Sequence, residues 1–162
     1  MIYSNFSIDH VCLTADKAFE KFSASLEEQL GRFDSAAYKE LEKGGDPQVT
    51  RASLESMVGP SGFMLFQKHN HGLVLRLVGK PRKAIQYALG NPLFAVEMTR
   101  YAIGAALYAP LRLLIYEPEE GKTTVEYDLP TALFGRFGDD NVDRMAESLD
   151  QKLEALIASA AG

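Results

Sequence analysis

The feature that most constrains the fold of this chain is an apolar stripe in the last part of the sequence. After Asp140, apolar side chains recur at helical spacing, at Val142, Met145, Leu149, Leu153, Leu156 and Ala160. Residues three or four apart share one face of a helix, so this spacing predicts a single helix over about residues 140–160 with Asp140 as its N-cap. Such a face must be buried, and we expect it to cover a sheet or a partner molecule.

The rest of the chain alternates between strand-like and helix-like patterns. Strands are predicted at about residues 6–14, 63–67, 73–78, 84–89, 111–117 and 123–128, and helices at about 19–30, 38–41, 47–58 and 93–106. Because the connectors at 69–72 and 79–81 are short and rich in turn residues, the second to fourth strands are expected to form an antiparallel meander. The predicted fold class is α+β: one mostly antiparallel sheet of about six strands with helices packed on one face, in a single domain over residues 1–162.

Composition argues against several classes of protein. Cys12 is the only cysteine among 162 residues, so the chain has neither an internal disulfide nor a cysteine-based zinc site. The net charge of -5 argues against a dedicated nucleic-acid-binding protein. No targeting segment, membrane-length apolar run or cofactor motif is recognisable. We therefore expect a cytoplasmic protein with no cofactor that binds neither nucleic acid nor membrane.

The middle of the chain carries several short motifs in a definite order. They are Gly90-Asn91-Pro92 after a strand, Pro110-Leu111 before a strand ending in Leu114-Ile115-Tyr116-Glu117, a turn at Gly121, and Tyr127-Asp128 followed by Pro130. In this order and spacing, residues 63–138 resemble a bacterial family catalogued as domain of unknown function number 302. The resemblance implies a fold similar to the TATA-binding-protein-like α+β class, with a long helix across an antiparallel sheet, and a homodimer. It implies no chemistry, because the family has no established catalytic residues.

Two departures from the family's pattern indicate a resemblance to a divergent branch of that family. Its members often have a helical, alanine-rich segment where this chain has His69-Asn70-His71-Gly72. They also often have Leu before the Pro-Leu pair, where this chain has Tyr108-Ala109. The motifs that carry the resemblance span a core of about residues 63–138. The predicted helix at 140–160 lies outside that core.

Asn91 is the first candidate for a ligand site. Asn followed by Pro is typical of a helix N-cap, because the side chain accepts a backbone hydrogen bond and Pro92 needs no N–H at the first helical position. The N–H groups that follow would also suit an anion such as phosphate or carboxylate. Capping and anion binding are therefore the two alternatives for Asn91.

Arg112 is the second candidate. Alternation along residues 111–116 places it on one face of its strand, where it either pairs with Glu126 or Asp128 or anchors the carboxylate of a ligand. For a ligand site, aromatic walls and hydroxyl groups would come from three tyrosines, Tyr87, Tyr108 and Tyr127. The alternative for the tyrosines is that they are core residues with one hydrated end.

The histidines offer a different chemistry. His69 and His71 are two residues apart, so on a continuing strand they would project from one face as metal ligands do, whereas at a turn they would be two exposed side chains. Asp9 and His10 are adjacent on a predicted strand and so point to opposite faces, which argues against an acid–base pair.

Two functions follow from these patterns. The first is a non-catalytic domain, expected as a homodimer, that binds a small apolar or anionic ligand between the sheet and its helices. The alternative is a hydrolase- or metal-type enzyme that uses His69, His71 and nearby carboxylates. The apolar stripe also permits a third interpretation, in which the chain simply self-associates.

Overall fold

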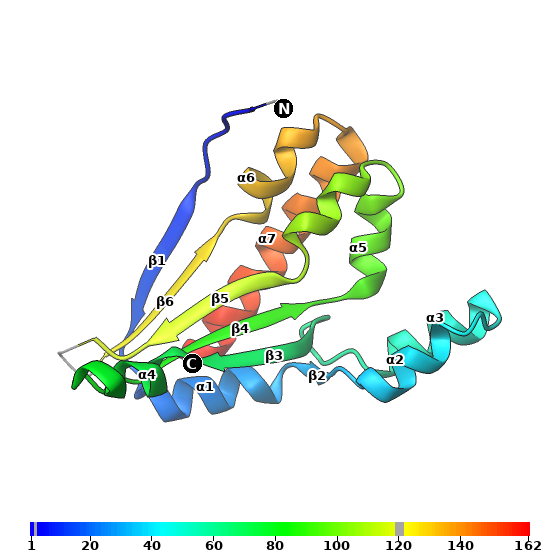
Figure 1. Cartoon of the computed structure of the whole chain (residues 1–162). Coiled ribbons are helices and arrows are strands. Elements are labelled where there is room, and N and C mark those ends of the chain that lie inside the picture. The colour runs from blue at the N-terminus through cyan, green and yellow to red at the C-terminus, as the bar shows by residue number, and fades with distance from the viewer. Residues whose placement is uncertain (2, 119–121) are drawn as a thin grey trace.

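The sheet organises the whole molecule, which we describe from a computed structural model covering residues 1, 3–118 and 122–162. Its six strands are β1 (His10–Ala15), β2 (Gly31–Arg32), β3 (Met64–Asn70), β4 (Ala84–Gly90), β5 (Leu111–Tyr116) and β6 (Thr123–Asp128). Their order across the sheet is β1-β6-β5-β4-β3-β2 (Figure 1). Every neighbouring pair is antiparallel except β2 with β3, which is parallel. The predicted mostly antiparallel sheet is confirmed.

Helices connect and cover the strands. The α-helices are α1 (Phe19–Glu28), α2 (Ser35–Leu41), α3 (Pro47–Ser56), α4 (His71–Val74), α5 (Pro92–Thr99), α6 (Pro130–Phe134) and α7 (Asp140–Ala161). Three short 3-10 helices follow α4, α5 and α6 in turn: η1 (Leu75–Val78), η2 (Ile103–Tyr108) and η3 (Gly135–Phe137). In Figure 1, α7 runs behind β4 and β5, while α2 and α3 project away from the sheet. None of the helices in the described residues has the length and apolarity needed to cross a membrane.

The core lies between one face of the sheet and the helices α1 and α7. Along β5, the alternate residues Leu111, Leu113 and Ile115 are buried, as the period of two in a strand requires. The α7 stripe is buried against them at Val142, Leu149, Leu153, Leu156 and Ala160. The long C-terminal helix and the α+β fold class are therefore confirmed. We call this face of the sheet the covered face.

The N-cap of α7 differs from the prediction by one residue. The side chain of Asp139, rather than Asp140, accepts hydrogen bonds from the backbone N–H groups of Asn141 and Val142, at 2.8 and 3.3 Å. The backbone of Asp139 is extended, as is typical of an N-cap, whereas Asp140 already belongs to the helix. Two consecutive aspartates offer the same capping group, so the pattern alone does not choose between them.

The strand predicted at residues 73–78 is wrong, because this segment forms α4 and η1. Asn70 caps α4 by accepting a hydrogen bond from the N–H of Leu73 at 2.9 Å, and Gly79 ends η1 with a φ of 69°. The apolar side chains of this segment, which suggested a strand, are largely exposed, Leu77 by 85%. A short apolar run does not distinguish a strand from a helical turn by periodicity alone. The meander consequently lacks its middle strand, and β3 pairs directly with β4.

Other elements depart from their predicted bounds. The sixth strand of the sheet is the two-residue β2, which the sequence pattern did not indicate. The helix predicted at 93–106 divides into α5 and η2, with Ala102 in an extended conformation between them. Two short helices, α6 and η3, occupy residues 130–137, where no element was predicted.

The second face of the sheet, which we call the open face, carries exposed and half-buried side chains. Arg112 and Cys12 are exposed on this face, and Glu126 and Tyr116 are half-buried. The two faces of the sheet therefore differ sharply in polarity, and each holds one candidate site.

Candidate functional site

An apolar cleft of about 240 Å³ opens where β4 and β5 meet α5, α6 and α7. Four aromatic side chains line it, those of Tyr38, Phe66, Phe94 and Phe134. The remaining wall is mainly aliphatic, with Met98, Leu111, Leu149, Pro92 and Pro110. Phe94, Met98 and Pro92 come from α5, and Leu149 comes from the stripe of α7. We refer to this space as the apolar cleft.

Asn91 lies at the rim of the cleft and is 9% exposed. Its Oδ1 accepts a hydrogen bond from the N–H of Leu93 at 2.9 Å, and its Nδ2 donates to the carbonyl of Gly62 at 3.0 Å. The predicted capping role is therefore present. The backbone carbonyl of Asn91 also accepts from the N–H groups of Phe94 and Ala95, at 3.0 and 3.1 Å.

These contacts bear on the anion-binding alternative. The first three N–H groups of α5 after Pro92 already have acceptors within the chain. An anion at this helix N-terminus would have to displace them, so the geometry supports capping and does not support an anion site here. Asn91 contributes to the cleft by fixing the direction in which α5 leaves the sheet.

One side of the cleft is formed by α2, which is otherwise peripheral. The ring of Tyr38 packs against Phe33 with centroids 5.2 Å apart, and Phe33 packs against Phe66 at 4.8 Å. This chain of three rings links α2 to the cleft wall. Those side chains of α2 that the structure describes are exposed, so Tyr38 is the contact through which α2 meets the cleft.

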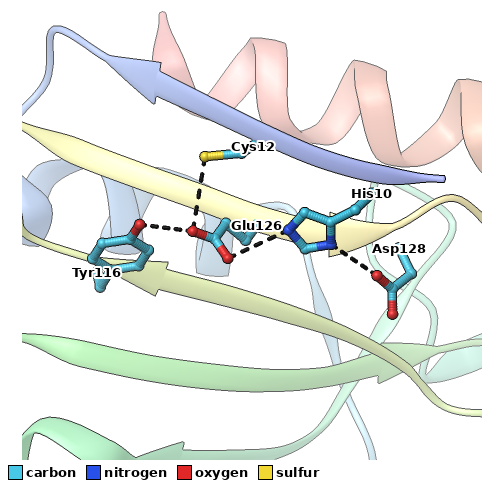
Figure 2. A network of polar contacts seen from close by, with 5 residues as sticks. All are labelled: His10, Cys12, Tyr116, Glu126 and Asp128. Atoms are coloured by element: carbon cyan, nitrogen blue, oxygen red, sulfur yellow. Dashed lines mark hydrogen bonds and ion pairs between the residues drawn. The ribbon is translucent and has the colours of Figure 1, made fainter. Parts of the chain in front are cut away.

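The open face holds a polar network between neighbouring strands (Figure 2). The Nδ1 of His10 lies 2.8 Å from Oδ1 of Asp128, and its Nε2 lies 3.4 Å from Oε2 of Glu126. The hydroxyl of Tyr116 donates to Oε1 of Glu126 at 2.7 Å, and the thiol of Cys12 lies 3.7 Å from the same oxygen. The register of β1 with β6 places His10 opposite Asp128 and Cys12 opposite Glu126.

Electrostatics determine what this network can do. The hydrogen bond to Asp128 raises the pKa of His10, and the hydrogen bond from Tyr116 lowers the pKa of Glu126. Desolvation and then the charge of Glu126 raise the pKa of Cys12, which favours the thiol over the reactive thiolate. Both ring nitrogens of His10 have carboxylate partners. The network is thus suited to tying β1 to β6 rather than to nucleophilic catalysis.

The residues predicted to surround Arg112 do not come together. Arg112 lies on the open face, and no carboxylate in the described part of the chain is within ion-pair distance of it. Glu126 and Asp128 instead contact His10. The predicted ion pair is therefore wrong. Arg112, Glu126 and Asp128 nevertheless line one shallow groove of the open face. The ligand-binding role of Arg112 stays a prediction.

The three tyrosines lie elsewhere. Tyr87 is buried on the covered face, where its hydroxyl donates to Glu27 at 2.8 Å and burial raises its pKa. Tyr127 also faces the core, and burial is the largest of the effects that raise its pKa. Tyr108 hydrogen-bonds to Arg136 and packs against Phe134, with ring centroids 6.1 Å apart, so it supports the cleft wall from outside.

The two histidines of the metal hypothesis lie on different elements. His69 belongs to β3, whereas His71 is the first residue of α4, and their ring centroids are 6.4 Å apart. Within the described ranges, no group of three or more His, Cys, Asp or Glu residues is arranged to hold a metal ion. A metal site there would therefore need ligands from outside the described ranges, and it stays a prediction.

The comparisons with known proteins agree with this fold. The family model for the domain of unknown function DUF302 matches residues 38–160, which extends beyond the 63–138 expected from the motifs and includes all but the last residue of α7. A crystal structure described as an uncharacterized conserved DUF302 protein from Bacillus stearothermophilus is similar, with a TM-score of 0.65 and 16% sequence identity. The similarity covers 93% of this chain and 97% of that one. No protein with a curated description matches the sequence. The family match and the shared architecture show that the chain belongs to the DUF302 family.

Proposed function

We propose that this protein is a non-catalytic binding domain that holds a small apolar ligand in the apolar cleft. The observation that carries the proposal is the lining, in which four aromatic rings and several aliphatic side chains surround about 240 Å³. Ligand sites are concave, mostly apolar and largely preformed, with a few polar groups that fix orientation. The position agrees with the expectation of a ligand between the sheet and its helices.

The size of the cleft suggests the size of the ligand. A cavity of about 150 Å³ lined by apolar side chains is large enough for benzene, and drug-sized ligands occupy about 300–1,000 Å³. The value of about 240 Å³ lies between them. The cleft therefore fits a ligand of one or two rings, or a short aliphatic group of similar volume.

The chemistry of the lining supports binding over catalysis. The polar side chains that line the cleft are those of Asn91 and Tyr38. The amide of Asn91 is occupied at both ends by the backbone of Leu93 and Gly62. The amide of Asn91 does not titrate, so it cannot act as a general acid or base.

Filling the cleft tests the proposal. Ala95 lines the cleft from α5, and Ala95→Leu would place three more carbon atoms in it while keeping a residue that favours helix. We expect the neutral probe 2-naphthamide to bind the wild type in a fluorescence titration. Because the added carbon atoms would occupy volume that the probe needs, the variant should bind about tenfold more weakly or worse, a loss of about 1.4 kcal/mol.

Val96→Leu is the matched control, because Val96 is the next residue of the same helix and is 51% exposed. This variant should bind the probe as the wild type does. Equal affinity in all three proteins, or no binding to the wild type, would contradict the proposal. Thermal unfolding of each variant without probe shows whether α5 is intact.

A further inference from the structure

Lys152 is a cation placed beside the apolar cleft. It lies on α7 one helical turn after Leu149, which lines the cleft, so the two side chains share one face of the helix. Its Nζ is 5.4 Å from the centroid of the Phe94 ring, which also lines the cleft. A Cβ placed on Gly62, whose carbonyl accepts from Asn91, would be 3.6 Å from this Nζ. The ammonium group therefore lies next to the Phe94 ring and near Gly62, close to the lining of the cleft although Lys152 is not itself part of it.

Lys152 differs from the five lysines for which the structure gives a polar partner. Lys17, Lys43, Lys68, Lys83 and Lys122 each have a hydrogen-bond acceptor or a carboxylate within reach. In the part of the chain that the structure describes, no carboxylate lies within 4.0 Å of the Lys152 Nζ, which lies over the Phe94 ring instead. Lys152 is also half-buried, although lysine is mostly exposed in proteins unless it is paired.

We propose that the ligand of the cleft is an aromatic carboxylate, with its ring between the aromatic side chains and its carboxylate at Lys152. This inference rests on the proposed function and specifies its ligand class. The flat ring follows from the rings of Phe66, Phe94 and Phe134, which favour stacked and edge-to-face contacts. The single ammonium provides a point charge for one anionic group, and a charge-assisted hydrogen bond at a partly desolvated rim supplies selectivity.

The arrangement also accounts for the different polarity of the two ends of such a ligand. Inside the cleft, the hydrogen-bonding groups of Asn91 are already used, so a polar group placed there would lack a partner. At the rim, Lys152 can move from the Phe94 ring towards a carboxylate, because its four-carbon side chain is flexible. The cleft therefore favours a ligand that is apolar at one end and anionic at the other.

The test compares two probes of the same shape, 2-naphthoate and 2-naphthamide, at neutral pH. Charge is the main difference between them. The wild type is expected to bind the naphthoate about tenfold more tightly, as a net gain from one charge-assisted hydrogen bond. Lys152→Met keeps the apolar stem of the side chain and should abolish this preference while leaving 2-naphthamide affinity unchanged. Lys152→Arg should restore it.

Lys21→Met serves as the control for lost charge, because Lys21 is exposed on α1 and should not affect the preference. If both probes bind the wild type with equal affinity, the carboxylate inference is overturned and the proposed function stands. A preference that survives in Lys152→Met also overturns the inference. If neither probe binds, both the inference and the proposed function fail. Unchanged 2-naphthamide binding in the Lys152 variants confirms that they are folded.

Discussion

The two faces of the sheet show how one strand can serve two purposes. On β5, Leu113 is completely buried against the helices, whereas its neighbour Arg112 is exposed on the open face. The covered face is held by packing of apolar side chains, which is strong and has little directional character. The open face is held by paired polar groups such as His10 and Asp128, which are weaker but depend on register. Stability and specificity of strand pairing are thus divided between the faces.

The largest expected difference between the faces comes from two adjacent leucines of β5. Leu113→Ala leaves a cavity on the covered face and should lower the free energy of unfolding by about 2–5 kcal/mol. Leu114→Ala removes a half-buried side chain on the open face and should cost about 1 kcal/mol. Urea unfolding of both variants measures the contrast. Equal losses would show that the open face is buried by another contact.

Asn91, at the end of β4, should give an intermediate effect. Asn91→Ala loses both the cap of α5 and the hydrogen bond to Gly62, and should cost about 1–3 kcal/mol. Asn91→Ser keeps a capping oxygen but is too short to reach Gly62, so it should recover part of this loss. A serine variant as unstable as the alanine variant would show that the Gly62 contact dominates. Urea unfolding distinguishes these outcomes.

The smallest effect is expected on the open face, from His10. Its pKa is raised by Asp128, so its stabilising contribution is complete below the unfolded value of 6.5 and is lost as pH rises through the folded pKa. The pKa of Glu126 is lowered, so its contribution is present above the unfolded value of 4.5 and is lost as pH falls through the folded pKa. The network is therefore fully formed at about pH 4.5–6.5.

The corresponding measurement is the melting temperature of the wild type and His10→Gln across pH. The difference between the two should be about 1–2 °C near pH 5.5 and should shrink at pH 9, because exposed ion pairs contribute little. A difference that grows with pH would contradict the assignment of His10 as a protonated partner of the carboxylates. Added salt should also reduce it at pH 5.5, since these groups are exposed to solvent.

Strong periodicity made much of the fold predictable. The stripe from Val142 to Ala160 specified α7, and alternation in residues 111–116 specified β5, because burial on one face imposes the period of the element on the sequence. The segment at 73–78 was mispredicted because its apolar side chains are exposed in the structure, so burial does not determine its pattern. There, the local signals of Asn70 as a cap and Gly79 as a helix end decide the conformation.

The candidate sites were less predictable for a different reason. The cleft is lined by Phe66, Phe94 and Phe134, which come from three separate elements and have no motif in common. The network of His10, Glu126 and Asp128 depends on β1 pairing with β6, and a sequence does not reveal which of six strands become neighbours. Alternating polar residues in both strands were the available signal, since they mark a face that is not packed.

The pairing of β1 with β6 has a consequence for how the chain is made. His10 and Asp128 are 118 residues apart in sequence, yet they lie opposite each other in the sheet. During synthesis, β1 is made before β6, and β6 is its only neighbouring strand in the described sheet. β1 therefore stays unpaired until β6 has been synthesised. Helix α1 lacks part of its packing surface for even longer, because it packs against α7, which is synthesised after β6. Ribosome-bound chains that stop before residue 123 should therefore carry an unpaired first strand, which chaperones have the opportunity to bind.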